Sequence, residues 1–111
     1  MLRAAVYDLK LDRGATFRRV LRVRQPDGQP VSLTQYDLAG TVRAVGLAEA
    51  PPVTNLGVSF ETTGLDGGMV LYLSPAQTEA LTKLRYAYDV RLTHKVSGDV
   101  WILLKGVMEV A

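Results

Sequence analysis

The chain has 111 residues, 48% hydrophobic and 22% charged, enough to bury one core without a metal or a disulfide. Cysteine is absent, which excludes disulfides, thiolate metal sites and cysteine nucleophiles. The net charge is only +2, and no apolar run approaches the roughly 18 residues that a membrane span needs. We therefore expect a single domain over residues 1–111, without a secretion signal before Asp8.

Basic side chains are concentrated in the first 24 residues. This segment holds seven basic and two acidic side chains, a balance of +5, whereas six basic and nine acidic side chains give the remainder −3. One interpretation is an ordinary solvated outer strand. The other is a basic face that docks onto an acidic partner surface or, with less support, onto nucleic acid. The residues that would form this docking face are Arg13, Arg18, Arg22 and Arg24.

Clusters of glycine, proline, asparagine and aspartate divide the chain into short segments, most of which alternate as strands do. The strands expected in the first half are Ala4–Leu11, Thr16–Arg24, Leu38–Val45 and Leu56–Thr62. In the second of these, Phe17, Leu21 and Val23 share one face. Arg19 falls on the same face, so it lies near the end of the sheet or snorkels outward. The turns expected between strands include Pro26–Pro30 and Gly64–Gly68, and Gly46–Asn55 predicts a loop.

The second half predicts three more strands and one short helix. The strands are Met69–Leu73, Tyr86–Lys95 and Val100–Val110. Ser74, Pro75 and Gln77 form a capping-box pattern with proline at the first helical position, so we expect a helix near residues 75–83. Tyr86 and Tyr88 open the next strand, and a tyrosine there commonly closes the E–F corner of an immunoglobulin-like sandwich through its hydroxyl.

Seven strands at regular spacing predict an all-β fold, an immunoglobulin-like β-sandwich with one short helix. The final strand is apolar on both faces, which indicates either a central buried strand or a face against a neighbouring subunit. Trp101 is interpreted as core filling first and as an interface anchor second. The apolar anchors that a partner would use are Trp101, Leu103 and the loop residues Pro51 and Pro52.

Groups that could perform catalysis are few. His94 is the only histidine, and its place beside Lys95 near a strand end favours a solvated residue over a general base. A zinc site of the usual composition is excluded, and the isolated Asp66 and Asp99 fit turns better than a calcium site. The chain has no strand–turn–helix nucleophile motif, and no helix follows the glycines of Gly64–Gly68 to bind a phosphate. We expect no enzyme activity, no metal and no cofactor.

The basic strand also lacks the aromatic side chains that often accompany nucleic-acid binding. Arg18, Arg22 and Arg24 share one face of their strand, but Phe17 lies on the other face. Since the net charge is small as well, the sequence favours a protein partner over nucleic acid.

Several segments, taken in order, resemble a small family of tailed-phage virion proteins. The family pattern has a Gly-Ala-Thr-Phe strand start, an Asp-Gly turn with proline leading into Val-x-Leu-Thr-x-Tyr, and a strand with an arginine. It continues with Leu-Ser-x-x-x-Thr-x-x-Leu, Tyr-x-Tyr-Asp and a final glycine-containing hairpin. The matching segments are Gly14–Phe17, Asp27–Tyr36, Thr41–Arg43, Leu73–Leu81, Tyr86–Val90, Gly98–Asp99 and Leu104–Gly106. The match covers most of the chain and is similar also to the N-terminal domain of baseplate upper proteins.

The resemblance implies a β-sandwich module that serves as a structural connector in a virion. The expected role is an adaptor at the tail tip or baseplate that attaches fibres or receptor-binding proteins. It would be made in the host cytoplasm and be present in multiple copies per particle, with other virion proteins as partners and no membrane contact. Capsid decoration is one alternative, and a nucleic-acid- or ligand-binding module is another. The chain departs from the family pattern at Leu47–Val53, where a partner-specific contact would fit.

Overall fold

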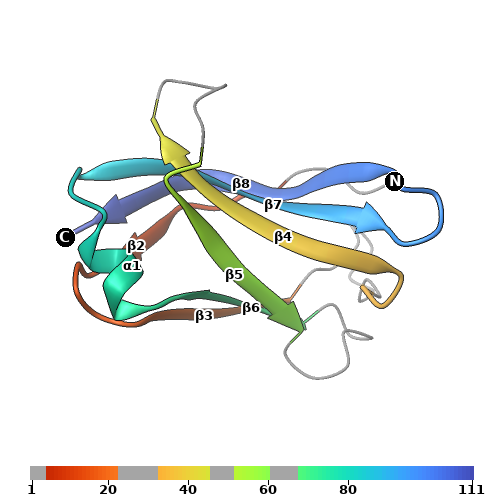
Figure 1. Ribbon diagram of the computed structural model, residues 1–111, viewed down its shortest axis with the longest axis horizontal. Helices are drawn as coiled ribbons and strands as arrows, with labels where there is room; N and C mark the ends of the chain where they lie inside the picture. The colour runs from red at the N-terminus through yellow and green to blue at the C-terminus, as the bar shows by residue number, and fades with distance from the viewer. Residues whose placement is uncertain (1–4, 23–32, 46–51, 61–67) are drawn as a thin grey trace.

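The computed structural model describes residues 5–22, 33–45, 52–60 and 68–111, which form eight strands and one short helix (Figure 1). The elements are β1 Ala5–Val6, β2 Leu9–Leu11, β3 Phe17–Arg22, β4 Tyr36–Ala44, β5 Thr54–Phe60, β6 Gly68–Leu73, α1 Pro75–Glu79, β7 Arg85–His94 and β8 Val100–Val110. The predicted turns at 26–30 and 64–67 and most of the predicted loop lie outside the described residues. Among the described residues, no helix has the length and apolar character needed to cross a membrane.

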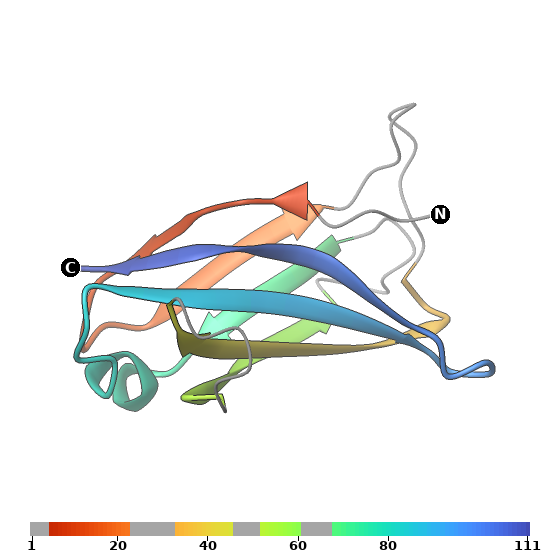
Figure 2. The ribbon, with the colours of Figure 1, turned by 90° about the horizontal axis from the view of Figure 1, so that it is seen from above.

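The strands form two layers that β5 connects. One layer has the order β1/β2–β8–β7–β4, and the other has the order β5–β6–β3. The first part of β5 pairs with β4, and its second part, Gly57–Phe60, pairs with β6. Figure 1 shows β5 crossing diagonally between the layers, and Figure 2 shows the layers from above. The predicted all-β, immunoglobulin-like sandwich with one short helix is confirmed, and the shared strand makes its sheet barrel-like.

Gly40 of β4 permits the crossing of β5. A Cβ atom added to Gly40 would lie 2.8 Å from Cβ of Leu56 and 2.9 Å from Cγ2 of Val58. Any larger residue at position 40 would therefore push β5 away at the point where it leaves one layer for the other.

The predicted first strand, Ala4–Leu11, is wrong in one respect, because it is interrupted at Tyr7 and Asp8. At this interruption the Tyr7 carbonyl lies against Gly106 of β8, where a side chain would collide with it. The Tyr7 amide donates to the Lys105 carbonyl at 2.9 Å, and the Asp8 carboxylate accepts from the Val107 amide at 3.0 Å. The Asp8 side chain thus replaces a backbone acceptor, which a simple alternation pattern does not reveal.

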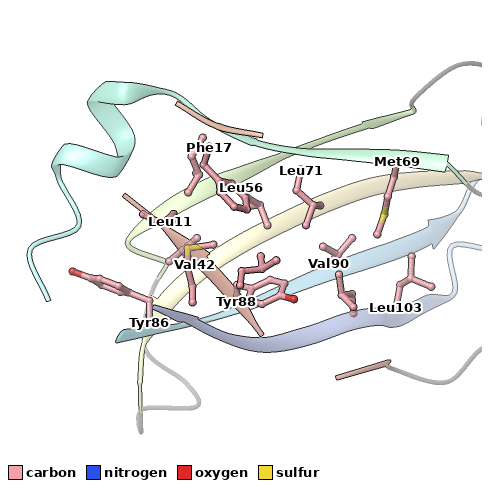
Figure 3. Close-up of a cluster of buried hydrophobic side chains, with 14 of the residues drawn as sticks. Leu11, Phe17, Val42, Leu56, Met69, Leu71, Tyr86, Tyr88, Val90 and Leu103 are labelled. Carbon is pink, nitrogen blue, oxygen red and sulfur yellow. The ribbon is translucent and has the colours of Figure 1, made fainter. Parts of the chain in front are cut away.

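The core lies between the layers and is built from alternate residues of each strand (Figure 3). Phe17, Leu56 and Leu71 enter it from one layer, and Val42 and Val90 enter it from the other. Each is at most 6% exposed, as the strand alternation predicts.

β8 is a central strand, because it pairs with β7 on one side and with β1 and β2 on the other. The register with β7 shifts between Val90 and Arg91, so that one extra residue of β8 is accommodated. This bulge explains why the consecutive residues Leu103 and Leu104 are both buried, at 3% and 6% exposed. Of the two explanations for this apolar strand, burial as a central strand accounts for these leucines.

The capping box is confirmed, but the helix is shorter than expected. The Ser74 hydroxyl accepts from the Gln77 amide at 3.2 Å, and the Gln77 side chain accepts from the Ser74 amide at 2.9 Å. The helix ends at Glu79 instead of near residue 83, because Leu81 leaves the helix to become fully buried. The Tyr86 hydroxyl then accepts from the Lys83 amide at 3.0 Å and closes the corner as predicted.

Candidate functional site

The motif segments that define the resemblance contact one another in pairs. Thr78 is fully buried, and its hydroxyl accepts from the Gly14 amide at 3.0 Å and donates to the Ala15 carbonyl at 2.8 Å. The Thr41 hydroxyl donates to the Asp89 carboxylate at 2.8 Å, which joins the β4 and β7 motifs. These motif residues therefore serve the scaffold, and surface recognition must come from other side chains.

Arg13 was predicted to belong to the docking face, but it holds the connection between α1 and β7. Its Nε donates to the Leu81 carbonyl at 2.7 Å, and its Nη2 contacts the Lys83 carbonyl at 3.4 Å. Both carbonyls lie in the connection after α1, and a guanidinium, with five N–H donors, can satisfy them together. The structure thus separates the role of Arg13 from that of the β3 arginines.

The Arg19 side chain snorkels outward, as one of the two sequence interpretations predicted. It is on the inner row of β3, between Phe17 and Leu21, yet it is only half-buried. Its Nη1 donates to the Tyr7 hydroxyl at 3.1 Å and so reaches toward the strand at the other margin of the sheet.

The outward row of β3 consists of Arg18, Val20 and Arg22, all exposed. Arg18 lies directly opposite Tyr72 of β6, and Val20 lies opposite Val70. Tyr72 is 41% exposed, and Val70 is 7% exposed. We call these residues the arginine–tyrosine face: Arg18, Val20, Arg22, Val70 and Tyr72.

Tyr72 corrects the prediction that no aromatic residue accompanies the arginines. Phe17 does point into the core as expected, but the aromatic neighbour comes from β6, more than fifty positions along the chain. The exposed Tyr72 in an apolar strand was the available signal. It could not be used without knowing that β6 pairs with β3.

The layer that carries this face is basic. The strand segments Phe17–Arg22, Thr54–Phe60 and Gly68–Leu73 contain three arginines and no acidic residue. On the other layer, by contrast, Arg91 lies 3.6 Å from Asp89 and Arg85 lies 3.9 Å from Glu109. The described parts of β3, β5 and β6 therefore carry basic side chains and no acidic ones.

The residues predicted as apolar anchors differ from one another in exposure. Leu103 is 3% exposed and belongs to the core, so its assignment as an interface anchor is wrong for the folded chain. Trp101 is half-buried and packs edge-on against Tyr36, with ring centroids 5.8 Å apart. Pro52 is exposed just before β5. Arg24 and Pro51 lie outside the described residues.

His94 has a structural role near the β7–β8 hairpin. Its Nδ1 accepts from the Val96 amide at 3.3 Å and from the Ser97 amide at 3.2 Å, and its ring packs edge-on against Tyr36. Both contacts stabilise the turn, which agrees with the strand-end interpretation of this residue.

Tyr88 is the described residue whose pKa is clearly perturbed. Burial raises its pKa from 10.0 to about 12, the negative charge of Asp8 and Tyr7 adds to this effect, and Arg19 opposes it. The Tyr88 hydroxyl donates to the Tyr7 carbonyl, and the residue as a whole is 3% exposed. Tyr88 therefore keeps its proton and fixes the interruption between β1 and β2.

A pocket of about 470 Å³ lies where β2, β7 and β8 meet near the C-terminus. The charged residues that line it include Lys10, Asp12, Arg85 and Glu109, of which the last two pair with each other. Within the described part of the chain, no group of three or more histidine, aspartate or glutamate residues could hold a metal ion. The arginine–tyrosine face is thus the better candidate for recognition.

Together, the fold and this face define an immunoglobulin-like module whose described β3, β5 and β6 strands carry basic side chains and no acidic ones. No protein-family model matches the sequence, and no curated protein matches it. The crystal structure of InlP from Listeria monocytogenes is similar, with a TM-score of 0.51 and 14% identity over 97% of this chain. This chain spans only 28% of the InlP chain. At this identity the similarity shows the fold alone.

Proposed function

We propose that this chain is a structural module of a tailed-phage virion, without enzymatic activity. It would act as an adaptor at the tail tip or baseplate and attach fibres or receptor-binding proteins. The observation that carries the proposal is the pairwise contact between motif segments, above all the bonds of Thr78 to Gly14 and Ala15. Motif segments that lie far apart in the sequence are therefore held together by these hydrogen bonds, which supports reading them as parts of one scaffold.

The distribution of side chains supports a connector over a catalyst. Three buried side-chain hydroxyls form hydrogen bonds with the backbone of the same chain; they belong to Thr78, Tyr86 and Tyr88. Arg18, Val20 and Tyr72 are among the exposed side chains that remain for recognition. A connector needs a rigid scaffold with a specific outer surface, and this arrangement supplies both.

Its partners would be other virion proteins, and several copies would be arranged by the symmetry of the particle. Attachment would depend on surface complementarity, with charge setting the orientation of the partner. No cofactor or metal enters this mechanism.

Particle fractionation tests the proposal. Virions would be purified, heads and tails separated, and this chain quantified in each fraction by mass spectrometry. We expect a fixed copy number per tail and antibody labelling at the tail tip. Recovery with isolated heads would contradict the tail-tip role in favour of capsid decoration, and absence from purified particles would contradict a virion role altogether.

DNA binding gives an independent check. We expect no appreciable binding of random DNA at physiological salt. Binding with a steep dependence on salt concentration would indicate contacts with several phosphates and would contradict the connector role.

A further inference from the structure

The sheet has two margins, and they differ in regularity. One margin is formed by the short strands β1 and β2 and is interrupted at Tyr7 and Asp8. The other margin is β3, which pairs with β6 at consecutive positions from Phe17 to Arg22 without a bulge or a proline. Short and interrupted edges discourage the pairing of a further strand, whereas a regular edge permits it. β3 is therefore the margin suited to accept another strand.

The two margins are not joined by a backbone ladder, because among the described strands β3 pairs with β6 alone. A side-chain bond spans them instead, from Nη1 of Arg19 to the Tyr7 hydroxyl at 3.1 Å, and this bond is exposed. Alternate residues of an edge strand direct their N–H and C=O groups away from the sheet. The segment Phe17–Leu21 thus presents the backbone groups that an extended segment needs to extend the ladder.

The arginines of β3 determine which segment fits this edge. Arg18 lies on the outer row of the strand and Arg19 on the inner row, and neither takes part in an ion pair of the described residues. A second copy of this chain is a poor match, because two β3 strands side by side would bring arginines together across the ladder. A segment with acidic side chains opposite Arg18 and Arg19 would instead form favourable cross-strand pairs.

Apolar side chains continue the edge beyond these arginines. Val20 is 37% exposed on the outer row, and Leu21 is only partly buried against the core on the inner row. On the opposite margin, Val6 is 71% exposed and Tyr7 is 40% exposed. An apolar side chain placed opposite Leu21 would remove from water some of the surface that the module alone leaves exposed.

We propose that β3 accepts an extended segment of a partner protein as an added antiparallel strand. Hydrogen bonds between the two backbones would hold this segment, with acidic side chains opposite Arg18 and Arg19 and an apolar side chain opposite Leu21. The antiparallel direction is chosen because its ladder is slightly more stable per residue than a parallel one. This inference rests on the proposed connector function, because it names the way in which the module would hold its neighbour.

An NMR titration with the peptide Thr-Val-Thr-Glu-Glu-Thr tests the inference. When the peptide runs antiparallel to β3, its valine lies opposite Leu21 and its two glutamates lie opposite Arg19 and Arg18. We expect amide shifts centred on β3 and, at saturation, hydrogen exchange slowed by about tenfold or more at alternate β3 amides. A peptide with Gln for both Glu should bind about fivefold more weakly or worse.

Two N-methylated peptides distinguish strand addition from charge attraction. Methyl groups are placed on alternate backbone nitrogens, at the odd positions in one peptide and at the even positions in the other. Alternate N–H groups of an extended segment point to the same side, so one peptide loses its hydrogen bonds to β3 and the other keeps them. We expect one of the two to lose binding by about tenfold or more, whereas charge attraction alone would weaken neither.

Matched variants identify the residues responsible. Arg18→Gln and Arg19→Gln should each weaken peptide binding by about fivefold or more, since each removes one cross-strand charge pair. The control is Arg85→Gln on the other layer, also an exposed arginine, which should change binding by less than about 1.5-fold. The amide spectrum itself verifies that each variant is folded.

Several results would overturn the inference. They are no binding of the acidic peptide, equal binding of the neutral peptide, unchanged binding of both N-methylated peptides, and tighter binding of a single-stranded DNA oligonucleotide than of the acidic peptide. Self-association of Arg18→Gln or Arg19→Gln with unchanged peptide binding would also overturn it, because the arginines would then only protect an edge strand. These failures differ from failure of the proposed function, which particle fractionation alone decides.

Discussion

The two outer faces of the sandwich use the same strand alternation but treat charge differently. On the β4–β7–β8 layer, Asp89 accepts from Thr41 at 2.8 Å and lies 3.6 Å from Arg91. On the β3–β5–β6 layer, the exposed arginines share their strands with no acidic residue, and Tyr72 stands among them. The first face pairs acidic with basic side chains, whereas the described strands of the second carry basic side chains alone.

An excess of one sign of charge on a face favours recognition of a partner there. Cross-strand and neighbouring charge pairs reduce the field that a face presents to solvent. A face with one sign of charge retains that field and can orient a binding partner. Both faces depend on the core between them, so substitutions in the core should cost more stability than exchanges of exposed charge.

Removal of the Tyr88 ring should have the largest effect on stability. Tyr88 is 3% exposed and packs in the core between the layers. Tyr88→Ala should lower the free energy of unfolding by roughly 3–5 kcal/mol, because it leaves a cavity and breaks the bond to the Tyr7 carbonyl. Urea denaturation measures this change. A loss within about 0.5 kcal/mol would show that the β7 inner face is misassigned.

Thr78 should have the next largest effect, because its hydroxyl links two motif segments. Thr78→Val keeps the shape but leaves the Gly14 amide and the Ala15 carbonyl without this partner. We expect a loss of about 2 kcal/mol by urea denaturation. Thr78→Ser retains the hydroxyl and is the control. If both variants lose the same stability, the hydroxyl is not what couples the segments.

Alkaline pH should destabilise the fold through Tyr88. Because its folded-state pKa is raised from 10.0 to about 12, the folded state binds the proton more tightly than the unfolded state. The stabilising contribution is complete below pH 10 and is lost as pH rises toward 12, with a slope approaching about 1.4 kcal/mol per pH unit. Thermal or urea denaturation across this range measures the slope. Tyr88→Phe should remove this component, and an identical pH profile for both proteins would contradict it.

The smallest effect should separate the two faces by charge alone. Arg85→Gln removes the pair with Glu109 and should cost at most about 0.5 kcal/mol, an effect that high salt reduces. Arg18→Gln removes an exposed charge from a basic layer and should leave the free energy of unfolding within about 0.5 kcal/mol of its original value, or raise it slightly. Parallel denaturation at low and high salt compares them. A larger loss for Arg18→Gln would mean that its charge is satisfied within the chain.

Much of the scaffold could be predicted from local pattern. Alternation located the strands around Phe17, Val42 and Leu71, and the Ser74 capping box located the helix start, because these signals involve neighbouring residues. The interruption at Tyr7 and the bulge at Leu103 could not be predicted, because each depends on contact with a strand far away in the sequence. The helix was predicted too long for the same reason, since burial of Leu81 ends it.

The candidate site was predicted only in part. Arg18 and Arg22 were correctly placed on one side of their strand, but Arg13 was grouped with them although it bonds to the carbonyls after α1. Tyr72 was missed, because an exposed aromatic residue in an apolar strand resembles a core residue when its neighbours are unknown.

Short-range periodicity and capping were enough to predict an all-β chain with a capped helix, a tyrosine-closed corner and a basic second strand. The position of Tyr72 beside Arg18 and the place of β5 between the two layers became evident from the strand pairing of the folded chain. The physical reason is that hydrogen bonding between distant strands sets their register. That register selects which exposed side chains become neighbours.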